Sequence, residues 1–172
     1  MFQRLFFIAF ILVSTSVYSA LLEQSAIESK VLIYSYIEKN GGELIQDETA
    51  LSGLVNKGDE PITLKEKTWV IPNKVGTGFE IAVGFKSIPL ELKQFDLQIT
   101  YPEMTLPSGE KRSQLNRPIH IADHDSKYLW YFSYYFDFPY EASPGDWEIE
   151  IRSKGNLIHS STFTVMNHEN EL

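Results

Sequence analysis

Cysteine is absent from the 172-residue sequence, and its absence removes several kinds of chemistry. The chain can form no disulfide, no thiolate metal site and no thiol nucleophile, and it has no N-terminal cysteine that could carry a lipid. Stability must therefore come from a hydrophobic core, which a chain of this length is able to build.

Basic residues are also scarce. The sequence has 15 Lys and Arg against 23 Asp and Glu, for a formal net charge of −8, and its longest basic cluster is the Glu110-Lys111-Arg112 neighbourhood. Phosphate backbones and anionic membrane surfaces attract positive charge. The composition therefore predicts neither nucleic acid nor an anionic membrane as a partner.

Familiar catalytic motifs are missing as well. No Gly-x-Ser-x-Gly turn is present to place a hydrolase nucleophile. The segment Gly76-Thr77-Gly78 has the glycines of a phosphate-binding loop, but no helix pattern follows it, and we interpret it as a glycine-bent entry into a strand. We therefore expect no cofactor and no enzyme activity.

One long apolar run is present, and it lies at the N-terminus. Arg4 precedes an unbroken apolar stretch from Leu5 to Val13, and the next residues are small and polar, which is the pattern of a secretory signal peptide. The run is shorter than the roughly 20 residues of a membrane-spanning helix. We predict a signal peptide over residues 1–19 and a single domain over residues 20–172, which would be periplasmic or secreted and not stably inserted in a membrane.

Much of the remaining sequence alternates apolar and polar residues, the period of a half-buried strand. In the clearest example Trp147, Ile149 and Ile151 alternate with charged residues, and Gly155 then allows a tight turn. The returning strand is predicted to place Leu157, His159, Ser161, Phe163 and Val165 on one face. Further extended segments are predicted over Ser29–Glu38, Glu43–Asp47, Pro61–Ile71, Phe79–Phe85, Phe95–Tyr101 and Tyr128–Phe138.

Other segments lack this pattern or fit a second one. We interpret Thr49–Asp59 as a loop or an irregular edge strand, and Glu110–Ser126 as a long polar connection. Pro102 is expected to end the strand before it, because proline has no backbone donor. A helix over Leu21–Leu32 is the competing interpretation at the start of the domain, although β-branched and aromatic residues after Val31 favour a strand.

Short strands between Gly- and Pro-rich turns, without a convincing amphipathic helix, predict an all-β fold: an antiparallel immunoglobulin-like β-sandwich of about seven or eight strands. The segments Trp69–Phe85, Tyr101-Pro102, Pro144–Trp147 and Phe163–Val165 also resemble an uncharacterised bacterial family of exported proteins, a domain of unknown function. The resemblance implies an immunoglobulin-like β fold. Its motifs are packing and turn motifs, so it implies no functional residues.

The segment from His120 to Asp125 contains two imidazoles and two carboxylates, which are suitable ligands for zinc or copper. Paired zinc-binding histidines this close together usually lie on one face of a helix, whereas Pro118 and the polar surroundings predict a loop here. We therefore predict no metal site. An envelope metal-binding protein or hydrolase that uses His120, Asp123 and His124 remains the alternative.

Tyr131 and Tyr135 are the candidate ligand contacts. They share a face of the predicted strand, opposite the face that is expected to enter the core. A tyrosine ring offers apolar area with a polar tip, so the pair is suited to stacking on sugars or to contacting a partner chain. The sequence thus predicts an exported, non-enzymatic β-sandwich that binds a protein or a glycan in the bacterial envelope.

Overall fold

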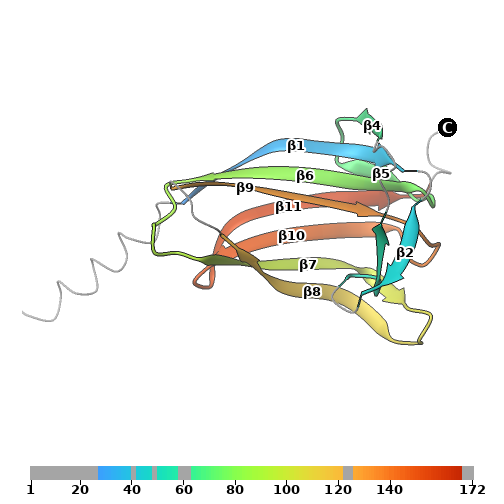
Figure 1. Cartoon of the computed structure of the whole chain (residues 1–172). Helices are drawn as coiled ribbons and strands as arrows, with labels where there is room; N and C mark the ends of the chain where they lie inside the picture. The colour runs from blue at the N-terminus through green and yellow to red at the C-terminus, as the bar shows by residue number, and fades with distance from the viewer. Residues whose placement is uncertain (1–26, 40–41, 48–49, 58–62, 122–125, 168–172) are drawn as a thin grey trace, which may run out of the picture.

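A computed structural model describes residues 27–39, 42–47, 50–57, 63–121 and 126–167 of the chain. These residues form two facing β-sheets and a short hairpin (Figure 1). They contain no helix, and hence none long and apolar enough to cross a membrane. The predicted signal peptide and its cleavage site lie outside the described residues.

The first sheet, sheet A, contains in spatial order β4 (Thr63–Glu66), β1 (Glu28–Glu38), β6 (Thr77–Lys86) and β9 (Lys127–Tyr135). The second, sheet C, contains β5 (Val70–Pro72), β11 (Asn156–Met166), β10 (Gly145–Ser153), β7 (Gln94–Thr105) and β8 (Lys111–His120). A separate hairpin, sheet B, consists of β2 (Glu43–Gln46) and β3 (Leu54–Lys57). Neighbouring strands are antiparallel except for β5 and β11, which are parallel.

The core lies between sheets A and C, where the inward-facing residues of each strand meet. Phe79 of β6 stacks on Phe163 of β11, with ring centroids 4.4 Å apart, and so joins the two sheets. Trp147 is fully buried, as predicted. The largest fully buried side chains are those of Trp147, Phe79, Phe85, Phe95, Phe136 and Phe163. The all-β sandwich prediction is confirmed.

The β10–β11 hairpin has the predicted pairing, with Trp147 opposite Phe163. Lys154 and Gly155 both have positive φ, at 49° and 83°, which is the geometry of a type I′ turn. One detail differs from the prediction, because Leu157 is exposed instead of facing the core. The register shifts between Ile151 and Arg152, and this irregularity falls beside Leu157 in the ladder.

Two predictions about β7 and β8 are wrong. Strand β7 continues through Pro102 to Thr105, because the register with β8 shifts between Thr100 and Met104 and the ladder needs no donor from the proline there. The predicted polar connection contains β8, which pairs with β7 over most of its length. As an edge strand β8 is largely exposed, so its sequence lacks the apolar alternation of a half-buried strand.

The described residues contain eleven strands, more than the seven or eight expected. Part of the difference arises because Pro61–Ile71, predicted as one extended stretch, supplies strands to both sheets. The change of sheet occurs near Trp69, whose ring stacks on Tyr34 at 4.2 Å and also contacts Phe163. Strand β3 accounts for a further strand, since it lies within a segment interpreted as a loop or irregular edge.

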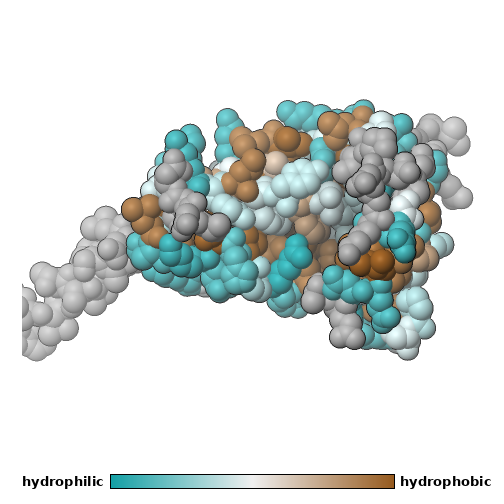
Figure 2. Space-filling view, viewed as in Figure 1, coloured by the Kyte–Doolittle hydropathy of each residue, from teal (hydrophilic) through white to brown (hydrophobic). Residues whose placement is uncertain are grey.

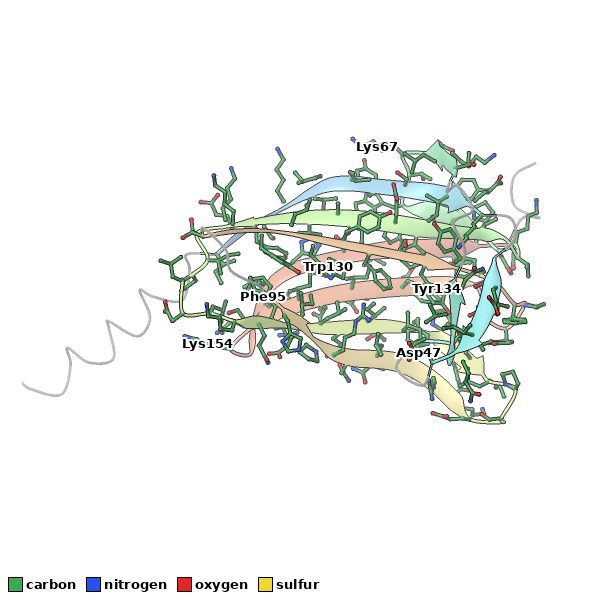
Figure 3. All side chains as sticks on the ribbon, in the orientation of Figure 1. Asp47, Lys67, Phe95, Trp130, Tyr134 and Lys154 are labelled. Atoms are coloured by element: carbon green, nitrogen blue, oxygen red, sulfur yellow. The ribbon has the colours of Figure 1, made fainter. Side chains whose placement is uncertain are left out.

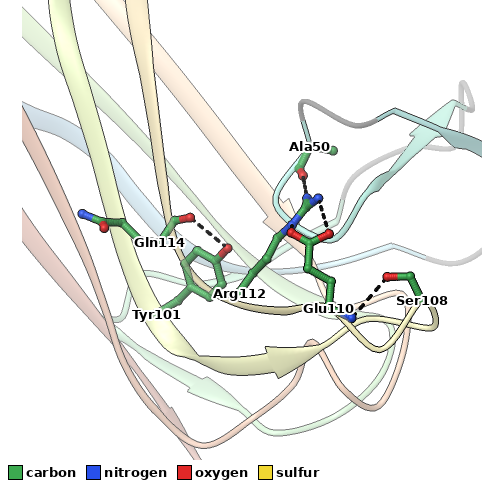
Figure 4. A network of polar contacts seen from close by, with 6 residues as sticks. All are labelled: Ala50, Tyr101, Ser108, Glu110, Arg112 and Gln114. Carbon is green, nitrogen blue, oxygen red and sulfur yellow. Dashed lines mark hydrogen bonds and ion pairs between the residues drawn. The ribbon is translucent and has the colours of Figure 1, made fainter.

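Sheet B is attached to the edge of sheet C by Arg112 of β8 (Figure 4). The Arg112 guanidinium forms an ion pair with Glu110, with Nε 2.7 Å from Oε1, and donates a hydrogen bond of 3.2 Å to the carbonyl oxygen of Ala50. Close by, the Tyr101 hydroxyl donates to the carbonyl oxygen of Gln114 at 3.4 Å. The bond from Arg112 to Ala50 thus holds the chain before β3 beside the edge strand β8.

Candidate binding face and adjoining pocket

Four large apolar side chains are exposed together on the outer face of sheet A. The exposed fraction is 53% for Leu32, 43% for Ile33, 60% for Leu129 and 49% for Tyr131. We call these four residues the apolar face. In Figure 2 brown atoms gather over β1 and the adjoining part of sheet A.

The strand register explains why these side chains adjoin one another. Ala82 of β6 lies between Ile33 and Tyr131 of the neighbouring strands. Gly84 lies opposite Leu129, and Leu32 packs so closely over Gly84 that an added Cβ would be 3.1 Å from its Cδ1. The small central residues leave room for the large ones, so the apolar face is continuous across three strands.

Glu80 lies beside the apolar face and is only 5% exposed. The Tyr131 hydroxyl donates a hydrogen bond of 2.5 Å to its carboxylate. Partial burial and this acceptor raise the pKa of Tyr131 well above its usual value. Tyr131 is therefore a neutral donor held in place, with its ring on the surface and its hydroxyl engaged by the protein.

Tyr135 lies on the same face of β9, as predicted, but its surroundings differ. It pairs with Gly78, where an added Cβ would come within 2.1 Å of the Tyr134 carbonyl oxygen, so the strands approach closely. The Lys39 ammonium lies 5.6 Å from the centre of the Tyr135 ring. The Tyr135 hydroxyl is buried and has no hydrogen-bond partner among the described residues. Burial together with the charge of Glu80 raises the pKa of Tyr135 to about 12.

The Tyr135 ring borders a pocket of about 300 Å³ between the edge strands β8 and β9 and sheet B. Figure 3 places Tyr134 and Asp47 at this end of the sandwich. The pocket is lined by Lys39, Asp47, Ala50, Leu51, Ser52, Leu54, Val55, Asn56, Leu115, Arg117, Phe132, Ser133, Tyr134, Tyr135, Asp137 and Glu141. Its walls thus combine apolar side chains with groups of both charges.

Two sets of polar contacts order this pocket. On one side Lys39 donates to the Asn56 side-chain oxygen at 3.2 Å, and the Asn56 amide donates to Asp137 at 3.0 Å. On the other side Glu141, 1% exposed, accepts bonds from the Tyr134 hydroxyl at 2.9 Å and the Phe138 amide at 2.7 Å. Burial raises the pKa of Glu141. Because both oxygens of the Glu141 carboxylate accept hydrogen bonds from the protein itself, Glu141 has a structural role.

The predicted metal-binding alternative can be placed only in part. His120 ends β8 and is exposed, whereas Asp123 and His124 lie outside the described residues. Within the described parts of the chain, no group of three or more His, Cys, Asp or Glu side chains could hold a metal ion. The absence of a metal site therefore stays a prediction.

Sequence reasoning placed Tyr131 and Tyr135 together but missed the groups around them. Glu80 alternates with buried apolar residues along β6, as any outward-facing acid would, and Glu141 lies in the turn region between β9 and β10. Neither position is distinctive in the sequence. Leu32 and Ile33 lie within the strand predicted over Ser29–Glu38, and nothing in that apolar run marks these two side chains as exposed.

The two facing sheets define an immunoglobulin-like β-sandwich. A solved immunoglobulin-like protein from Pseudomonas aeruginosa is similar, with a TM-score of 0.54 and 15% sequence identity, over 83% of this chain and 98% of that chain. The chain belongs to the family described as Domain of unknown function (DUF3859), whose model matches residues 44–165. This membership and fold confirm what the sequence resemblance implied. No curated protein matches the chain.

Proposed function

We propose that this protein is a non-enzymatic binding module of the bacterial envelope and that it binds a protein through the apolar face of sheet A. The observation that carries the proposal is the joint exposure of Leu32 and Ile33 on β1 and of Leu129 and Tyr131 on β9, the two strands that flank β6. Contiguous apolar patches of this kind mark interaction sites more often than isolated apolar residues do.

The chemistry of this face favours a protein over a glycan. Sugar recognition requires hydrogen-bonding groups that converge on hydroxyls. Three of the four side chains are aliphatic, and the Tyr131 hydroxyl already donates to Glu80. A protein partner, in contrast, can cover aliphatic side chains and use the flat tyrosine ring as an anchor.

The envelope location is supported by the leader pattern of residues 1–19. We expect protein recovered from the periplasm or the medium to begin at Ala20. Intact-mass measurement tests this, and a mass that retains residues 1–19 would contradict the proposed export.

The binding proposal is tested by affinity capture from an envelope extract with three matched proteins. Leu32→Glu places a charge on the apolar face, whereas Thr162→Glu places the same charge on an exposed position of β11, in the other sheet. We expect one partner to be captured by the wild type and by Thr162→Glu but not by Leu32→Glu. Equal capture by all three proteins would sink the proposal.

The pocket beside Tyr135 supports a second candidate, a small polar ligand such as a glycan end. A volume of about 300 Å³ is at the lower end of the range for ligand sites, and aromatic, amide and carboxylate groups converge there. Titration of labelled protein with envelope oligosaccharides should shift NMR resonances of the pocket residues. Such shifts should be lost in Asn56→Ala, and shifts spread over the whole surface would argue against this site.

A further inference from the structure

The free edges of the two sheets are unequally protected. An exposed edge strand offers unpaired backbone groups to other chains, and proteins usually blunt it with short length, charge or proline. Strand β4 has four residues and includes Lys65 and Glu66, and β5 has three and ends in Pro72. Strand β8 is longer, but it contains Arg117 and Pro118 as well as two basic residues at its start.

Strand β9 has none of these protections beyond its first residue. It spans nine residues, Lys127–Tyr135, with no proline and no charge after Lys127. Among the described strands only β6 pairs with it. No second described strand therefore pairs with this largely uncharged, aromatic-rich edge, although its end from Phe132 onward borders the pocket beside sheet B.

The backbone hydrogen bonds show which residues of β9 point outward. Phe136 exchanges bonds of 2.8 Å with Gly76 and Thr77, and at the other end the Ser126 carbonyl accepts from the Ile88 amide at 3.2 Å. The even-numbered residues thus face β6, and alternation along an antiparallel strand turns the odd-numbered ones away. Lys127, Leu129, Tyr131 and Ser133 present their amide and carbonyl groups at the open edge.

We propose that a second copy of this chain pairs with this edge, β9 against β9, antiparallel and centred on Trp130. In this register Leu129 of one copy lies opposite Tyr131 of the other, and Lys127 lies opposite Ser133. The outward groups of both strands then meet in hydrogen-bonded pairs, and outer-face side chains stay with outer-face side chains.

The strand is self-complementary in this register. Leu129 and Tyr131, both exposed in the single chain, become cross-strand neighbours twice over, and such pairs of aromatic and aliphatic residues stabilise sheets. Ser133 is the register partner of Glu80, so Lys127 of one copy lies on the strand next but one to the strand that carries Glu80 of the other. The apolar faces of the two copies become adjacent on one continuous sheet. The pairing uses the backbone edge and does not depend on the proposed envelope partner.

Sedimentation equilibrium of the purified chain tests the self-association. Leu129→Pro removes an outward amide at an edge position that tolerates proline, while Leu129→Thr removes the same side chain and keeps the amide. We expect a wild-type dimer whose dissociation constant rises about 100-fold in Leu129→Pro, from two lost hydrogen bonds per dimer, and much less in Leu129→Thr. Leu32→Glu, on the face but not at the edge, should leave the dimer intact. A wild type that is monomeric at all concentrations, or a dimer indifferent to Leu129→Pro, overturns the proposal.

Cysteine cross-linking tests the register and does not require the proline variant to fold. Because the chain has no cysteine, Lys127→Cys and Ser133→Cys proteins can be oxidised separately or as a mixture. The paired Cα atoms would be about 5.5 Å apart, within the range of a disulfide, whereas two copies of the same residue would lie about 20 Å apart. Dimers cross-linked only in the mixture support the register. Cross-links in the single variants, or none in the mixture, refute it.

Discussion

Replacement of Trp147 by alanine should be among the most damaging single changes in this protein. The indole is completely buried and lies within 6 Å, centroid to centroid, of four rings: those of Tyr101 at 5.0 Å, Tyr134 at 4.8 Å, Phe79 at 5.5 Å and Phe136 at 5.8 Å. Burial of about 150–250 Å² at about 25 cal/mol per Å² is worth about 4–6 kcal/mol.

One contribution of Trp147 to the free energy of unfolding is unfavourable. The Trp147 Nε1 group is buried without a hydrogen-bond partner among the described residues, and such an unpaired donor costs about 1–3 kcal/mol. Trp147→Ala removes this cost as well as the packing. The midpoints of the two ranges leave about 3 kcal/mol, at the lower end of the about 3–5 kcal/mol range for truncating a buried aromatic residue.

Urea unfolding followed by far-UV circular dichroism measures this loss without relying on tryptophan fluorescence. Since domains commonly have only about 5–15 kcal/mol of stability, Trp147→Phe provides a milder variant that keeps a ring and should lose less than about 2 kcal/mol. Glu148→Ala, on the exposed side of the same strand, should change the free energy of unfolding by less than about 0.5 kcal/mol. If Glu148→Ala were as damaging as Trp147→Ala, the assignment of faces in β10 would be refuted.

Three further outcomes follow from the structure. Burial lowers the pKa of His159, so below about pH 6.5 the unfolded chain binds a proton more readily than the folded chain, and the free energy of unfolding should decrease as the pH is lowered. Denaturant melts at pH 7.5 and pH 5 should show a smaller decrease for His159→Gln than for the wild type. Gly78→Ala should lower the melting temperature more than Gly84→Ala, because the new methyl meets a backbone carbonyl in the first case and a flexible side chain in the second; equal effects would argue against the close strand approach. Tyr131→Phe removes the donor to the buried Glu80 carboxylate and should cost about 1–3 kcal/mol in a urea melt, with an unchanged stability counting against that hydrogen bond.

The strands that sequence analysis found are those with one face in the core and one in water. Trp147, Ile149 and Ile151 lie on the buried side of β10, and the charged residues between them lie outside, so the alternation is visible in the sequence. Strand β8 was missed because solvent covers most of its surface, and its polar residues carry no period. The prediction that the strand ends at Pro102 is wrong because the register shifts locally, so that the ladder between β7 and β8 requires no backbone donor at the proline.

The candidate site shows the same division. Parity along one strand was enough to place Tyr131 and Tyr135 on a common face away from the core. It could not show that Glu80, 51 residues away in the sequence, would accept the Tyr131 hydroxyl, or that sheet B would form a pocket beside Tyr135. Those neighbours are brought together by strand pairing over long sequence separations.

Local sequence patterns are thus enough to predict the all-β sandwich, the residues of its main hairpin and the burial of Trp147, because alternation and turn residues act between near neighbours in the chain. In contrast, the folded arrangement is needed to show that Leu32 and Ile33 share one exposed face with Leu129 and Tyr131, and that β9 is an edge among the described strands. Both features depend on which strands become neighbours. That choice is made by the packing of the whole core, and no short segment encodes it.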